Sequence, residues 1–160
     1  MHITFAPRNI LQIDDARIIH RNFAGAGNMY NREGDRNFSV VIETRELADE
    51  LIERGWNVKT KESSDPGEVP LMYLPVKVKY FDDRGPSAYL KSGNAVTKLD
   101  ENTIHRLDKV SVLSADLDIR PYDWGPINGK YGRSAYLDSI DVTQKVDRFA
   151  ERYANEDVEY

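Results

Sequence analysis

The sequence of 160 residues contains no cysteine and no long uninterrupted apolar run. The first absence excludes disulfides, thiolate zinc sites and a cysteine nucleophile, and it is consistent with a reducing cytoplasm. The second predicts no membrane-spanning helix, which needs roughly 18 consecutive apolar residues. The first residues also lack the basic region and apolar stretch of a signal peptide. We therefore expect a soluble, cytoplasmic protein that makes no contact with a membrane.

The sequence is also poor in patterns that indicate catalysis. His20 and His105 are too far apart to be two metal ligands on one helical turn, and no phosphate-binding glycine loop with Lys-Ser or Lys-Thr is present. The carboxylates of Asp14-Asp15, Asp116 and Asp118 leave a metal-dependent nuclease as one alternative. However, Asp116 and Asp118 alternate with apolar residues, as on the exposed face of a strand. We expect no enzymatic activity, no cofactor and no metal.

Positive charge is in the minority, since the net charge is -5 and the pI is about 5.2. The negative charge is concentrated in residues 151–160, which have a net charge of -3. Three segments have a net charge of +2 each: residues 17–38, 69–91 and 120–136. Because the contact face of a nucleic-acid-binding protein is usually basic, the distribution of charge is more informative than the total.

Alternating apolar residues predict a mainly β protein with one or two helices. The expected strands are Ile10–Phe23, Asn37–Ile42, Asn57–Lys61, Leu71–Phe81, Ser87–Lys91, Val110–Tyr122 and Arg133–Thr143. Thr44 is expected to cap a helix that ends near Arg54, and Asp100 is expected to cap a short helix up to Leu107. Asn128-Gly129 predicts a hairpin turn.

These elements favour an oligonucleotide-binding-like, five-stranded β-barrel with additions over residues 1–145, followed by an acidic tail over residues 146–160. A β-sandwich with a peripheral helix remains an alternative.

Arginines, aromatic rings and glycines are interleaved between Arg21 and Phe38, around a glycine-rich loop over residues 24–36. Cations that follow phosphates and rings that stack on bases are typical of a groove for single-stranded nucleic acid. The residues predicted to contact DNA are Arg21, Phe23, Tyr30, Arg32, Arg36, Tyr73, Lys77, Lys79, Tyr122, Trp124, Lys130 and Arg133. The structural alternative is that the aromatic rings complete the core, which we expect for Phe38 and Trp56.

Seven short segments contain most of the arginines, aromatic residues and glycines discussed above: residues 21–25, 30–38, 55–59, 73–76, 121–124, 128–130 and 135–137. In these segments the chain resembles a family of bacteriophage single-stranded DNA-binding proteins. The resemblance implies an oligonucleotide-binding barrel without catalytic activity that acts in replication or recombination of phage DNA in a bacterial host. A homo-oligomer is compatible with such a role.

The last residues, Glu156, Asp157, Val158, Glu159 and Tyr160, are similar to the acidic tails of replication-type single-stranded DNA-binding proteins. Such a tail predicts competition with DNA for a basic groove and binding of replication or recombination proteins. The remaining alternative is an acidic protein-interaction or inhibitor module.

Overall fold

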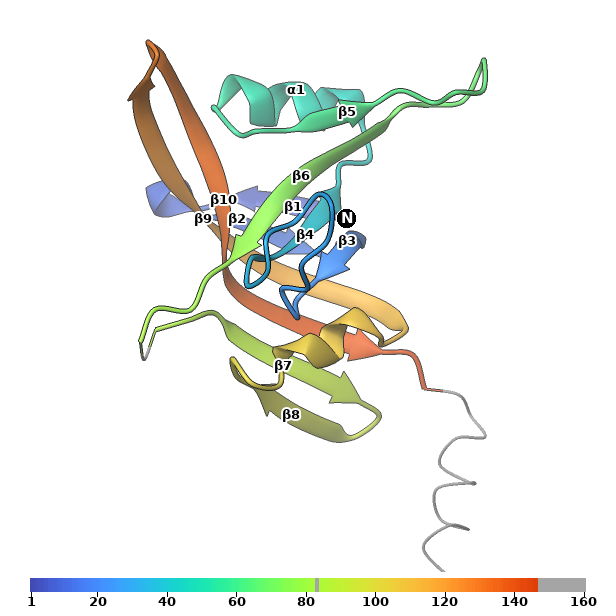
Figure 1. The fold of residues 1–160 in the computed structure, drawn as a ribbon. Helices are drawn as coiled ribbons and strands as arrows, with labels where there is room; N and C mark the ends of the chain where they lie inside the picture. The colour runs from blue at the N-terminus through green and yellow to red at the C-terminus, as the bar shows by residue number, and fades with distance from the viewer. Residues whose placement is uncertain (83, 147–160) are drawn as a thin grey trace, which may run out of the picture.

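A computed structural model describes residues 1–82 and 84–146. This part of the chain forms a mainly β structure with a single α-helix, α1 (Arg45–Glu53) (Figure 1). The strands are β1 (His2–Phe5), β2 (Leu11–Asp14), β3 (Ile18–Asn22), β4 (Arg36–Val41), β5 (Lys59–Lys61), β6 (Leu71–Val78), β7 (Ser87–Ser92), β8 (Ala95–Leu99), β9 (Val112–Ile127) and β10 (Lys130–Gln144). Two short 3-10 helices are η1 (Pro7–Asn9) and η2 (Ile104–Asp108).

The ten strands of the described residues form one sheet with the order β1-β2-β9-β10-β6-β4-β3. β5 pairs with β6, and β8 pairs with β7, which in turn runs parallel to β10. The hydrogen-bonded order has two ends, at β1 and β3, so the sheet is open by this criterion. The prediction of a mainly β fold is therefore confirmed, whereas the closed five-stranded barrel is not confirmed by this strand pairing.

Period-two alternation determines which side of each strand faces the core. In β6, Leu74, Val76 and Val78 are buried, whereas Lys77 is exposed. In β10 a register shift between Leu137 and Ser139 opposite β9 interrupts the alternation. The shift allows apolar residues on both sides of the irregularity to remain in the core, as β-bulges commonly do.

Helix α1 begins as the sequence predicts. The Thr44 Oγ1 accepts a hydrogen bond from the Leu47 N–H at 3.2 Å, which satisfies one of the free N–H groups of the first turn. The helix buries Ala48 and Leu51, and Gly55 follows its end with a φ of 93°, a conformation that glycine adopts readily. Trp56 is buried in the core, as expected.

The expected strand Ile10–Phe23 is divided into β2 and β3. Asp15 adopts a φ of 52° between the two strands, and the N–H of Ala16 then donates to the carbonyl of Ala115 on the neighbouring segment at 2.7 Å. Strands β1 and β8 were not predicted, and the helix expected from Asp100 to Leu107 is the shorter η2. The two-residue turn at Asn128-Gly129 is confirmed, because β9 ends at Ile127 and β10 begins at Lys130.

Candidate nucleic-acid interface

A row of polar and aromatic residues crosses four strands on the outer face of the sheet. Strand register places Asn37 on β4 opposite Lys77 on β6. Lys77 lies opposite Tyr136 on β10, which in turn lies opposite Arg120 on β9. Residues opposite one another on paired strands project to the same face. The row therefore brings together side chains that are up to about one hundred positions apart in the sequence.

Tyr136 is the centre of this row. Its ring stacks with that of Tyr122 at a centroid distance of 5.4 Å and an interplanar angle of 8°. The guanidinium of Arg120 lies 5.0 Å from the Tyr136 ring centroid, and the Lys77 ammonium lies 5.9 Å from it. We call Lys77, Arg120, Tyr122 and Tyr136 the platform. It combines two positive charges with a tyrosine pair whose outer member, Tyr122, is 51% exposed.

The β9–β10 hairpin extends the platform beyond the body of the sheet (Figure 1). Trp124 follows Arg120 and Tyr122 at two-residue intervals on β9, so all three side chains share one face. The Trp124 ring lies over Gly132 on β10, where an added Cβ would be only 2.2 Å from the indole Cζ2. Gly132 thus allows the indole to lie against the backbone of the ribbon, and Trp124 remains 36% exposed.

Two hollows with several cationic side chains adjoin the platform. One, of about 440 Å³, is lined among others by Tyr30, Lys59, Lys77 and Lys79. The other, of about 560 Å³, is lined among others by Lys79, Arg84 and Arg120. Lys79 lines both hollows, and we call the two together the groove. Lys79 also lies 3.9 Å from the Asp35 carboxylate, an exposed ion pair that contributes little stability.

The β9 face changes its chemical character along the strand. N-terminal to Arg120, the same face carries Asp116 and Asp118, and these carboxylates line a small recess with Asp14 and Asp141. We call these four residues the acidic recess. Among residues 1–82 and 84–146, no group of three or more acidic or histidine side chains is arranged to hold a metal ion. The sheet face therefore has a cationic, aromatic half and an anionic half.

Phe23 cannot contact DNA, and its prediction is wrong. The side chain has 0% exposure and stacks on Phe38 in the core at a centroid distance of 4.9 Å. Its position results from an irregularity in β3, where His20 has a φ of 52° and the register with β4 shifts between Ile19 and Asn22. Such a shift moves the following residues to the opposite face.

Three arginines that were predicted to bind phosphates make structural contacts within the protein. The Arg21 Nη1 donates to the carbonyls of Leu107 and Val110, both at 2.8 Å, and the Arg36 Nη1 donates to the carbonyl of Phe23 at 2.8 Å. Both guanidinium groups thus hold backbone carbonyls in place. Arg36 also lines the hollow of about 440 Å³, and the contacts of Arg21 and Arg36 with DNA stay predictions.

Arg133 is the third of these arginines. Its guanidinium forms a bidentate ion pair with Asp123, in which Nε donates to Oδ1 at 2.7 Å and Nη2 donates to Oδ2 at 3.2 Å. The guanidinium carbon also lies 5.3 Å from the centroid of the Trp56 ring. Arg133 also donates to the carbonyl of Arg54, at the end of α1. Its hydrogen bond lowers the pKa of Asp123 below the usual range. Arg133 therefore attaches the back of the hairpin to the helix end.

The other predicted contact residues are accessible or partly accessible. Tyr30, Arg32 and Lys130 are exposed, and Arg32 lies 3.8 Å from Asp35. Tyr73 is partly buried and makes an edge contact with His20, at a centroid distance of 5.2 Å. The predicted tail residues Glu156, Asp157, Glu159 and Tyr160 lie outside the described residues.

Sequence reasoning missed Arg120, Tyr136 and Lys59 as members of the site. Arg120 could have been found, because it precedes Tyr122 by two residues on a predicted strand. Tyr136 could not be assigned without the register between β9 and β10, and Lys59 belongs to the site only through the pairing of β5 with β6.

Cations and exposed rings on an open β surface, extended by a projecting hairpin, define a class of protein that binds single-stranded nucleic acid. A family model described as "Putative phage ssDNA-binding domain" matches residues 2–158. The chain belongs to this family of phage single-stranded DNA-binding domains. No curated protein matches the sequence.

Solved structures with a similar fold come from bacteriophage Enc34. Its single-stranded DNA-binding protein in complex with single-stranded DNA has a TM-score of 0.58 at 12% identity, covering 92% of this chain and 93% of that one. The same phage protein in another structure has a TM-score of 0.56 at 12% identity, covering 93% of this chain and 88% of that one. At this identity the comparison establishes the fold. No helix in the described part of this chain is long and apolar enough to span a membrane.

Proposed function

We propose that this protein binds and protects single-stranded DNA, without catalysis and largely independently of sequence, during phage DNA replication or recombination in the cytoplasm of the bacterial host. The observation that supports this proposal most directly is the platform, in which Arg120 and Lys77 flank the stacked rings of Tyr122 and Tyr136. Aromatic faces accept any base, and cations attract phosphates of any sequence.

The acidic recess supports a particular direction for the bound strand. A polyanion that followed β9 towards its N-terminal end would meet Asp118 and Asp116, which repel phosphates at short range. A strand that crosses from β9 over β10 and β6 towards β4 meets Arg120, Lys77 and Lys79 instead. We propose that the DNA crosses the strands of the sheet along the groove.

We also propose that the core is an oligonucleotide-binding-type barrel with additions. The pairing of β10 supports this proposal, because β10 pairs with β6 at Ala135 and Tyr136 and with β7 from Ser139 to Thr143, with a register shift between Leu137 and Ser139, and a bulged strand bends the sheet. Partner replication or recombination proteins that bind the acidic tail, and assembly into a homo-oligomer, belong to the same proposal.

Fluorescence polarisation of labelled homopolymeric oligonucleotides tests the function. We expect binding to oligothymidylate, oligoadenylate and mixed sequences, with affinities that fall as salt is raised. Failure to bind any single strand at low salt would refute the proposal and favour an acidic protein-interaction module. Cleavage of the oligonucleotide that requires magnesium or manganese would contradict the non-catalytic assignment and support a nuclease.

A further inference from the structure

The loop between β3 and β4, residues 24–35, exposes two large apolar side chains at its tip. Met29 is 88% exposed and Tyr30 is 94% exposed. Neither residue is packed into the core that stabilises the rest of the protein. Fixing the backbone of one residue costs roughly 1–2 kcal/mol in conformational entropy, so an ordered loop with an unburied tip requires other interactions.

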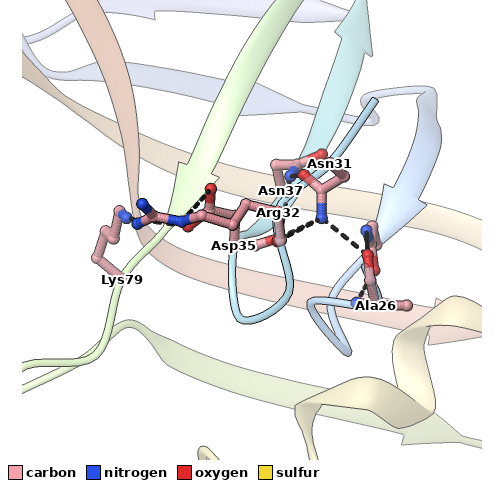
Figure 2. A network of polar contacts seen from close by, with 7 residues as sticks. Ala26, Asn31, Arg32, Asp35, Asn37 and Lys79 are labelled. Atoms are coloured by element: carbon pink, nitrogen blue, oxygen red, sulfur yellow. Dashed lines mark hydrogen bonds and ion pairs between the residues drawn. The ribbon is translucent and has the colours of Figure 1, made fainter. Parts of the chain in front are cut away.

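The side-chain amide of Asn31 supplies several of these interactions (Figure 2). Its Nδ2 donates to the backbone carbonyls of Ala26 at 2.9 Å, Arg32 at 3.2 Å and Asp35 at 3.0 Å. Its Oδ1 accepts a hydrogen bond from the Asn37 Nδ2 at 2.9 Å. Asn31 therefore ties the two sides of the loop together and joins them to the first residue of the row that crosses the sheet.

The tip itself is a tight turn. The N–H of Asn28 donates to the carbonyl of Asn31 at 2.8 Å, and the reverse hydrogen bond is 3.3 Å long. The Asn28 Oδ1 also accepts a hydrogen bond from the N–H of Tyr30 at 2.8 Å. Below the turn, Asn22 exchanges two side-chain hydrogen bonds with the backbone of Ala26. Polar side chains rather than apolar packing thus determine the conformation of the loop.

The location of this turn indicates its role. Tyr30, Asn31 and Asn37 all line the hollow of about 440 Å³, together with Lys59 and Lys77. A loop held rigidly in a binding-competent conformation loses less entropy when a ligand binds, which increases affinity. An exposed tyrosine beside cationic side chains is suited to stacking on a base whose phosphates lie in the groove.

From these contacts we infer that Asn31 is a positioning residue that holds the Met29-Tyr30 tip in place to stack on bases of single-stranded DNA at the edge of the groove. This inference rests on the proposed function. It assigns to Asn31 an effect on affinity that acts through the tip and needs no direct contact between Asn31 and DNA.

A double-mutant cycle in the full-length protein tests the inference. Removing the tip with Met29→Ala/Tyr30→Ala should raise the Kd for oligothymidylate by about 5- to 160-fold, the equivalent of one lost base stack. Asn31→Ala alone should also raise the Kd, but by no more than the tip variant. Combined with the tip variant, Asn31→Ala should add nothing, because the side chains that it positions are already absent.

Hydrogen exchange provides a readout that separates positioning from general stability. Asn31→Ala should accelerate amide exchange in residues 24–35 and leave β4 and β6 protected. Asn102→Ala is the matched control, because Asn102 is exposed and the side-chain amide forms no hydrogen bond in the described part of the chain. If Asn31→Ala unfolds the protein, Asn28→Ala is the second variant. It removes only the side-chain oxygen that accepts a hydrogen bond from the Tyr30 N–H, and it can be combined with the tip variant in the same double-mutant cycle.

Two results would overturn the inference while the proposed function survives. One is a tip variant that binds like the wild type although platform variants bind more weakly. The other is an additive loss of affinity when Asn31→Ala is combined with the tip variant, which would indicate a direct contact or a general structural role. A wild-type protein that binds no single strand would overturn both the inference and the proposed function.

Discussion

Replacing Tyr122 with alanine tests the platform most directly. Tyr122 is 51% exposed, and its ring stacks on Tyr136 at 5.4 Å, so it is the member of the pair with more surface for a base. One stacked base contributes about 1–3 kcal/mol, which corresponds to an increase in Kd of about 5- to 160-fold. Loss of the tyrosine pair should reduce stability by about 0.5–1.5 kcal/mol in addition to the area that the half-exposed Tyr122 buries, which is small against the total stability of a domain, so the variant should remain folded.

The assay is polarisation of fluorescein-labelled oligothymidylate at one fixed salt concentration, with circular dichroism to verify folding. Tyr122→Phe keeps the ring and should bind like the wild type. Tyr89→Ala is the matched control, because Tyr89 lies on β7 opposite Asp141 of the acidic recess, outside the proposed path of DNA. A folded Tyr122→Ala variant with unchanged affinity would refute the stacking role, and an equal loss in Tyr89→Ala would refute the proposed path.

Three other predictions concern charge, the acidic tail and stability. Lys77→Ala/Arg120→Ala should reduce the slope of log affinity against log salt by about 1.4, since each phosphate contact contributes about 0.7 on a single strand, and an unchanged slope would exclude both contacts. Removal of residues 154–160 should tighten binding at low salt in polarisation assays by removing a competing anion, and unchanged affinity would argue against competition. Thr44→Ala should lower the free energy of unfolding in urea by about 1 kcal/mol and leave the Kd unchanged, because it removes only a helix cap and Thr44 lines neither hollow of the groove; a change in Kd would contradict that separation.

Local signals in the sequence were sufficient for the elements that depend on neighbouring residues. The alternation in β6, the Thr44 cap of α1 and the turn at Asn128-Gly129 are each encoded within a few positions, and the structure has all three. Closure of the sheet depends instead on which strands pair over long distances. For this reason the expected five-stranded barrel could not be distinguished in advance from a larger open sheet.

In the candidate site, too, local signals could be predicted from the sequence, whereas contacts that depend on long-range strand pairing could not. The predicted strand ends at Tyr122, so the sequence names Tyr122 and Trp124 as contact residues without placing them on one face; β9 continues to Ile127, and only the register with β10 brings Tyr136 against Tyr122. Phe23 was predicted to contact DNA, but a single residue with positive φ, His20, changes the alternation of β3, and the Phe23 side chain is buried. An arginine such as Arg133 is a typical phosphate ligand, and only the fold reveals that its guanidinium is already paired with the Asp123 carboxylate.

The central position of β10 has a consequence for synthesis of the protein. This strand pairs with β9, β6 and β7, yet it is the last of the described strands to leave the ribosome. Until it emerges, Lys77 and Arg120 belong to strands that have no common neighbour between them. A nascent chain that has not yet paired β10 therefore lacks the assembled platform, and we expect its affinity for DNA to appear only after β10 has emerged and joined the sheet.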